Sequence, residues 1–289
     1  MQRSVTFSRR GRWVALAAAM GLGTSLAGCG GDDEDKKSTR LVPAGTKVNT
    51  LQVSVTEKGP NRFQYRAQKT VREGLVQIRF ENRAKTPRKA QLWRVGDGHS
   101  VKEALRVRRP LPRWLEWAGG VSLTQPGRTG TSVQPLSAGT YYVTGIGGER
   151  RGVAPLEVTK AGGATKLSSA ADARITSVDY GYRVSGLAPG PASVEFRNTG
   201  DEPHHAFFVP LRDGRTLAEA KDFFAGKSAG PPPVDPDATR ETAVLEGGQS
   251  QVTRLGLQSG RYALLCFVSD RAGGPQHTEK GMVTEVKVP

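Results

Sequence analysis

Short stretches in which apolar and polar residues alternate recur along most of the chain, separated by glycine, proline and asparagine. Alternation with a period of two is typical of half-buried β-strands, and many short strands with turn signals between them indicate β-sandwiches. The pattern predicts an all-β fold, with only two short helices, at residues 100–107 and 216–224. Strands are predicted over residues 51–55, 76–80, 90–95, 141–144, 174–178, 194–196, 206–209, 262–267 and 282–288.

The predicted strands belong to an internal repeat. The sequence VQIRFENRAKTPRKAQLWRVGDGHSVKEAL from residue 76 aligns without a gap with ASVEFRNTGDEPHHAFFVPLRDGRTLAEAK from residue 192, and LSAGTYYVTG aligns further on with LQSGRYALLC. The shared residues are turn formers and core positions, as a common fold requires. We therefore expect two domains, the first repeat (residues 47–160) and the second repeat (residues 172–289), joined by a small-residue linker over residues 161–171.

The N-terminus has the features of a secretory leader over residues 1–28. Four arginines and no acidic residue precede an apolar run over residues 13–26, which is too short for a comfortable membrane span. The run ends in Leu-Ala-Gly-Cys and resembles a bacterial lipobox, in which the cysteine, here Cys29, is lipidated and becomes the new N-terminus. Residues 29–46 would then form a flexible tether to the membrane. The alternative is an ordinary leader followed by a stray cysteine.

Residues with soft donor atoms are scarce and lie close together in the second repeat. The chain has two cysteines, three methionines and four histidines. After the leader and its lipobox, Cys266 is the only cysteine and Met282 the only methionine, and His277 lies between them. His204 and His205 precede a strand in the same repeat. A thiolate, imidazoles and a thioether form a ligand set that suits copper, whereas the alternative is an inert buried cysteine.

The first repeat serves as an internal control on this interpretation, because it keeps the turns and core positions but has none of the candidate ligands. Residues that only packed a core would be retained in both repeats, whereas the residues of a metal site are gained or lost together. The aligned pairs are His204 with Arg88, Cys266 with Gly145 and Met282 with Val153. We therefore expect the first repeat to be a degenerate copy without copper ligands.

The second repeat resembles the cupredoxins, the type 1 or blue copper family related to plastocyanin. The motifs that carry the resemblance are Asn198-Thr199-Gly200 leading to Pro203-His204, then Gly260-x-Tyr262-x3-Cys266, then Pro275-x-His277-x4-Met282. The resemblance implies two tandem cupredoxin-like Greek-key β-sandwiches. It also implies one type 1 copper in the second, with three strong ligands and a weak axial methionine. Carried over by motif, these are His204, Cys266, His277 and Met282.

His204 and His205 compete for one ligand position. Successive strand residues face opposite sides of a sheet. The phase of His204 continues through Ala206 and Phe208, and its equivalent positions in the first repeat are also apolar. We therefore expect His204 to point inward as the ligand and His205 to face solvent.

The resemblance implies a single-electron carrier rather than an enzyme. Two-domain nitrite reductases and multicopper oxidases place histidine beside the copper cysteine to reach a second metal centre. Here the neighbours of Cys266 are Leu265 and Phe267, and His99 stands apart from the other histidines. Two alternatives stay open: a metal-free binding or structural lipoprotein on the same fold, and copper storage or delivery.

Charge is unevenly distributed between the repeats. The first repeat has 21 lysines and arginines against 8 acidic residues, a net +13, and the second has 13 against 15, a net −2. A basic domain beside a lipid anchor could lie against anionic lipid, a wall polymer or an acidic protein, leaving the His277 edge free for a redox partner that the sequence does not identify. Arginine-rich composition is the alternative. Nucleic acid is not expected as a partner outside the cytoplasm.

Overall fold

The computed structural model describes residues 41–108, 110–145, 152–162, 166–228 and 230–289, and Thr39–Pro289 cluster into one compact unit. The predicted leader, Cys29 and most of the tether lie outside the described residues.

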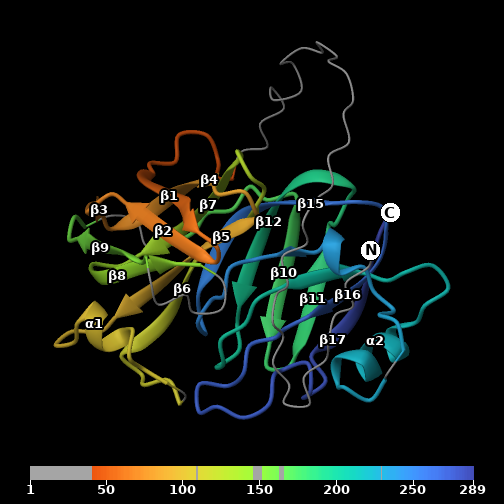
Figure 1. The fold of residues 1–289 in the computed structure, drawn as a ribbon. Helices are drawn as coiled ribbons and strands as arrows, with labels where there is room; N and C mark the ends of the chain where they lie inside the picture. Colours follow the sequence, from red (N-terminus) through yellow and green to blue (C-terminus); the bar gives the residue numbers. More distant parts are fainter. Residues whose placement is uncertain (1–40, 109, 146–151, 163–165, 229) are drawn as a thin grey trace. The chain divides into compact units, whose positions relative to one another are not determined.

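Strands predominate and confirm the all-β prediction (Figure 1). The first repeat contains β1 (Asn49–Gly59), β2 (Arg62–Ala67), β3 (Thr70–Arg72), β4 (Gly74–Arg83), β5 (Arg88–Val95), β6 (Leu115–Thr124), β7 (Thr129–Leu136), β8 (Gly139–Thr144) and β9 (Ala154–Thr159). The second contains β10 (Ala173–Val178), β11 (Gly181–Ser185), β12 (Gly190–Asn198), β13 (Phe207–Pro210), β14 (Arg240–Glu241), β15 (Ser250–Leu257), β16 (Gly260–Leu265) and β17 (Val283–Val288).

The two predicted helices form at equivalent places in the repeats. They are α1 (Val101–Ala104) and α2 (Leu217–Phe224), and a short 3-10 turn covers Pro236–Ala238. Both helices begin with a capping box, in which a Ser or Thr side chain and a Glu three residues later each satisfy a backbone N–H of the first turn. Over the described part of the chain, no helix combines the length and the apolar character that crossing a bilayer requires.

The repeats have the same strand connectivity. β1 runs parallel to β4, and β10 runs parallel to β12. β4 pairs with β7 as β12 pairs with β15, and the antiparallel series β5–β8–β9 corresponds to β13–β16–β17. Each repeat therefore places its strands in two sheets that enclose a core, which confirms the sandwich architecture.

One buried asparagine in each repeat makes the same hydrogen bonds. The Asn82 side chain donates to the carbonyls of Thr86 and Thr124 and accepts from the N–H of Ala84. Asn198 donates to the carbonyls of Glu202 and Leu245 and accepts from the N–H of Gly200. The asparagine shared by the two aligned sequences thus fixes the turn after β4 in one repeat and after β12 in the other.

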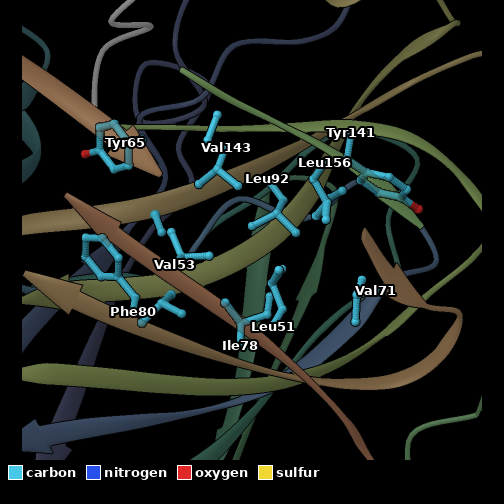
Figure 2. Close-up of a cluster of buried hydrophobic side chains, with 14 of the residues drawn as sticks. Leu51, Val53, Tyr65, Val71, Ile78, Phe80, Leu92, Tyr141, Val143 and Leu156 are labelled. Carbon is cyan, nitrogen blue, oxygen red and sulfur yellow. The ribbon is translucent and has the colours of Figure 1, made fainter. Parts of the chain in front are cut away.

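Alternating strand residues form a separate core in each repeat. In the first, Leu51, Ile78, Phe80 and Leu92 are fully buried and meet side chains from the facing sheet (Figure 2). In the second, the corresponding cluster includes fully buried Ile175, Phe196, Phe208, Leu245 and Leu264. Burial of a large apolar side chain contributes about 1.5–3 kcal/mol, so these clusters supply the main stabilisation of both repeats.

The repeats also share one sheet. β15 pairs with β7 through Val252 opposite Val133, which gives an eight-stranded sheet in the order β11-β10-β12-β15-β7-β4-β1-β2. Both valines pack with Leu167, a residue of the predicted linker. The division into two domains at residues 161–171 stays a prediction, because residues of both repeats belong to the same compact unit.

Candidate metal centre

The structure brings three of the four predicted ligands into one buried cluster. His204, Cys266 and His277 are each 0% exposed, and their potential ligand atoms all lie within 4.8 Å of one another. Within the described residues, this is the one group of three or more His, Cys, Asp or Glu side chains with such a spacing. Met282 is also fully buried and packs in the same apolar cluster as Cys266.

The loop from Cys266 to Met282 is folded back on itself by its own backbone. The N–H of Thr278 donates to the carbonyl of Cys266 at 3.0 Å, and the N–H of His277 donates to that of Val268 at 2.8 Å. The N–H of Met282 donates in turn to the carbonyl of His277 at 2.8 Å. These bonds explain how a loop with ten residues between its cysteine and its histidine still holds both ligands together.

A bridge to the neighbouring segment places His204. Its N–H donates to the carbonyl of Leu245 and its carbonyl accepts from the N–H of the same residue, at 3.0 and 2.9 Å. The conformation of the preceding turn is held by Asp179, whose carboxylate accepts hydrogen bonds from the backbone N–H groups of Asp201 and Glu202. A Cβ on Gly200 would lie 2.2 Å from a carboxylate oxygen of Asp179, so glycine is required at this close approach.

The two imidazoles present the same nitrogen to each other. Their Nδ1 atoms are 3.0 Å apart, and each Nε2 lies 2.9 Å from a carboxylate, that of Asp179 for His204 and that of Asp270 for His277. An ionised carboxylate only accepts hydrogen bonds, so each Nε2 carries the proton and each neutral ring turns an Nδ1 lone pair inward. Two lone pairs at this distance repel unless a proton or a metal cation lies between them. Carboxylate partners of this kind orient metal-binding histidines.

Burial dominates the protonation of the cluster. It raises the pKa of the Cys266 thiol to about 12, even though backbone N–H groups and the Tyr182 hydroxyl favour the thiolate. Burial, followed by the charge on His204, lowers the pKa of His277 to about 4. At neutral pH the histidines are therefore neutral and ready to bind a cation, while the thiol must release its proton to do so.

His277 is covered, which corrects the expectation of a free edge at this residue. The ring of Tyr180 meets that of His277 edge-on, with centroids 5.2 Å apart. Lys280 lies over the Tyr180 ring, and its ammonium group contacts both the Tyr180 hydroxyl and Asp270. Tyr180 has a φ of 68°, an uncommon value for a tyrosine, at the turn between β10 and β11.

The prediction that His205 faces solvent is wrong. It is 5% exposed, and its Nε2 accepts the N–H of Phe267 at 3.1 Å. Its Nδ1 is 3.6 Å from the carboxylate of Glu241, which forms a buried ion pair with Lys89 of the first repeat at 2.9 Å. The strand phase correctly separates His204 from His205, but the other side of the strand is covered by protein.

The residues that surround the ligands could not be identified from the sequence. Asp179 and Asp270 lie at turns where acidic residues are common, and only the folded chain shows their carboxylates at the imidazoles. Tyr182 and Trp117 pack against the cluster that contains Cys266 and Met282. Trp117 comes from the first repeat, so no motif of the second repeat could have identified it.

Comparison with known proteins gives structural neighbours only. The sequence matches no family model and no curated protein. Auracyanin from Roseiflexus castenholzii is 22% identical, with a TM-score of 0.27 over 40% of this chain and 94% of that one. A multicopper oxidase is 12% identical, with a TM-score of 0.25 over 86% and 92%. A copper-containing nitrite reductase from Thermus scotoductus is 11% identical, with a TM-score of 0.20 over 84% and 61%.

These TM-scores are low, so the neighbours do not identify a function. The strand connectivity and the buried cluster of this chain agree with what the motifs of the second repeat imply. The His204–Cys266–His277 cluster, with Met282 beside it, is a ligand set that fits one type 1 copper site.

Proposed function

We propose that this protein is an extracytoplasmic, lipid-anchored carrier of single electrons that uses one type 1 copper in the second repeat. The observation that carries the proposal is the pair of Nδ1 atoms of His204 and His277, 3.0 Å apart beside a buried thiol. Each ring is held by a carboxylate on its far side, so both lone pairs converge on one point. A soft cation with affinity for imidazole and thiolate would satisfy all of these groups.

Copper held there would supply a couple between Cu(II) and Cu(I). The protein's part is to keep the ligands in one arrangement for both states. His204 and Cys266 belong to segments with paired backbones, and the loop that holds His277 and Met282 is closed by its own hydrogen bonds. Complete burial of the four side chains excludes water as an additional ligand.

A carrier is favoured over an enzyme or a storage protein. A catalytic copper needs a coordination position open to substrate, and a delivery protein needs ligands that a partner can reach. The four proposed ligands are 0% exposed, and Tyr180 and Lys280 cover His277. Cys266 is flanked by Leu265 and Phe267 rather than by a histidine that could lead to a second metal.

The test is the visible and electron paramagnetic resonance spectrum of the full chain titrated with Cu(II). One equivalent should produce an intense thiolate-to-copper absorption band, and Cys266→Ser should remove it. Reduction should bleach the band and reoxidation restore it. A wild-type protein that binds no copper, or binds it without the thiolate band, contradicts the proposal and favours the metal-free alternative.

The lipid anchor is proposed on Cys29, because Leu-Ala-Gly precedes it at the end of the apolar run. Mass spectrometry of the mature N-terminus should find a diacylated cysteine at this position. Cleavage elsewhere with an unmodified Cys29 contradicts the proposal.

The basic first repeat is proposed to lie against anionic lipid near the anchor. Basic residues close to such a surface contribute about 1 kcal/mol each. Full-length Cys29→Ser protein should bind vesicles that contain anionic lipid, lose binding steeply with added salt, and ignore neutral vesicles. Equal binding to both kinds of vesicle, or no effect of salt, would mean that the net charge of +13 is only a feature of the composition and does not bind the protein to anionic lipid.

A further inference from the structure

The first repeat has none of the predicted metal ligands, yet it is hydrogen-bonded directly to the loop between Cys266 and Met282. We propose that residues 111–117 of the first repeat are a structural part of the metal centre, which hold the loop between Cys266 and Met282 in shape through Arg271. Arg271 would be a positioning residue that acts on His277. The inference deepens the proposed function and rests on it for its copper readout, whereas its structural half concerns the protein without metal.

The backbone of Arg271 is held on both sides. Its N–H donates to the carboxylate of Glu202 at 2.7 Å, and its carbonyl accepts the N–H of Leu111 at 2.7 Å. Glu202 lies two residues before His204, and Leu111 belongs to the first repeat. One loop residue therefore connects the segment of the upstream histidine with the other repeat.

The guanidinium group of Arg271 adds a second connection to the first repeat. Its Nη2 donates to the carbonyls of Pro112 and Leu115 at 2.7 and 2.8 Å. Its Nη1 lies 2.6 Å from the carboxylate of Glu246, and both side chains are largely buried, at 18% and 14% exposure. A planar guanidinium reaches several acceptors at fixed angles, which the single ammonium group of lysine does not.

Arg271 is adjacent to Asp270, which holds His277, so its hydrogen bonds to the first repeat and to Glu202 affect the position of this ligand. Its neighbour Asp270 accepts the Nε2–H of His277 at 2.9 Å. A shift of the backbone at Arg271 would move the Asp270 carboxylate and with it the plane of the imidazole. Tyr180 and His205 also contact the loop, through Asp270, Lys280 and Phe267. Arg271 adds the hydrogen bonds that fix the loop to the first repeat and to the segment of Glu202.

Trp117 supplies an independent contact between the first repeat and the ligands. Its side chain packs against the cluster of Val244, Cys266, Val268 and Met282. The backbone N–H of Trp117 donates to the Glu246 carboxylate at 3.1 Å, and the backbone carbonyl of Trp117 accepts the N–H of Glu246 at 3.1 Å. Glu246 thus pairs with both Trp117 and Arg271. The same part of the first repeat holds the loop and packs beside the thiol and the thioether.

The experiment compares the wild-type full chain with Arg271→Met in two readouts. In the protein without metal, amide hydrogen exchange over residues 266–282 should become faster while exchange in β4 and β12 stays unchanged. With copper bound, release to a chelator, followed by the thiolate band, should become roughly 10- to 100-fold faster, as is usual when an outer-shell partner is removed. Arg271→Lys should give smaller changes, because it keeps the charge beside Glu246.

Arg261→Met is the matched control. Arg261 pairs with Glu285 through two nitrogens and donates to the carbonyl of Arg215, but all its partners lie in the second repeat. This variant should leave the loop exchange and the copper release as in wild type. The same result for Arg271→Met overturns the inference, as does an equal effect of both variants.

Two further outcomes are decisive. If Arg271→Met does not fold, Arg271→Lys is compared with Arg261→Lys, and a loop that exchanges equally in both overturns the inference. If the wild-type chain binds no copper, the proposed function fails, while the exchange measured without metal still decides whether Arg271 holds the loop.

Discussion

His204 and His205 are adjacent and both buried, but their ring nitrogens have different partners. His204 turns its Nδ1 towards His277 and its Nε2 towards Asp179. His205 uses its Nε2 as an acceptor for the N–H of Phe267, the residue after Cys266. The two rings would not exchange these roles. The His204 Nε2–H donates to an ionised carboxylate and leaves Nδ1 free to bind a metal, whereas the His205 Nε2 already accepts a backbone N–H and has no lone pair left for a metal.

Substitution of the two histidines should therefore have different consequences. His204→Ala is expected to remove the thiolate-to-copper band, because a strong ligand is lost. His205→Ala is expected to keep the band but to lower the free energy of unfolding by about 1–3 kcal/mol, since a buried backbone N–H loses its acceptor. Absorption spectra and chemical denaturation measure the two effects. A band lost in His205→Ala and kept in His204→Ala would reverse the assignment.

At the scale of elements, tight turns connect the strand ends to the ligands. The turn after β12 is held by Asn198 and by the Asp179 carboxylate, which accepts the N–H groups of Asp201 and Glu202. Asp179 also bonds His204, so one carboxylate both shapes the turn and orients a ligand. The conformation of the hairpin between β10 and β11 is thereby connected to the metal cluster.

Gly200→Ala tests this connection. The new Cβ would lie 2.2 Å from Oδ1 and 2.9 Å from the backbone nitrogen of Asp179, so the two turns must separate. We expect lower thermal stability and a copper affinity reduced by roughly 10- to 100-fold, as for other losses of a ligand's outer partner. Gly214→Ala is a control for stability, because it lies in a turn with no atom near its added Cβ, although its positive φ alone costs some stability. Unchanged copper affinity in Gly200→Ala would contradict the role of Asp179.

At the scale of the whole molecule, the two repeats are joined by a buried ion pair as well as by a shared sheet. Although burial raises the pKa of Glu241, the attraction of Lys89 and His205 lowers it to about 2, below the ordinary value of 4.5. A carboxyl group with a depressed pKa stabilises the fold above its unfolded value and loses this contribution as the pH falls through its folded value.

The free energy of unfolding should therefore fall as the pH is lowered from about 4.5 to about 2. Glu241→Gln should remove part of this dependence and cost about 3–5 kcal/mol at neutral pH, because the buried Lys89 loses its partner. Denaturant titrations of both proteins across this pH range measure the difference. An identical pH dependence in the two proteins would show that Glu241 contributes nothing to it.

Thermal unfolding should occur in one cooperative transition. The pairing of β15 with β7, the Leu167 cluster and the Lys89–Glu241 pair all cross between the repeats, so neither repeat can unfold without exposing surface of the other. Differential scanning calorimetry of the metal-free full chain measures this. Two well-separated transitions would mean that the repeats are independently stable.

Nine of the strands, the repeat and the scarce ligands follow from the sequence itself, whereas others, among them β6, β7 and β15, are not predicted from it. Alternation reports which strand residues face a core, and the alignment of the repeats shows that Cys266, His277 and Met282 are absent from the first copy. The same periodicity selects His204 over His205, and the structure places His204 in the cluster. These features are local or periodic, so one sequence contains enough information to predict them.

Tertiary structure alone decides what surrounds the ligands. Periodicity states that His205 faces away from His204, but only the fold shows that Glu241 and Lys89 cover that side. Arg271 and Trp117 likewise acquire their partners across more than a hundred residues of sequence. The carboxylates at the imidazoles and the contact with the first repeat depend on the docking of segments that are remote in the chain. Their geometry is set by long-range packing, which no pattern within a strand or a motif encodes.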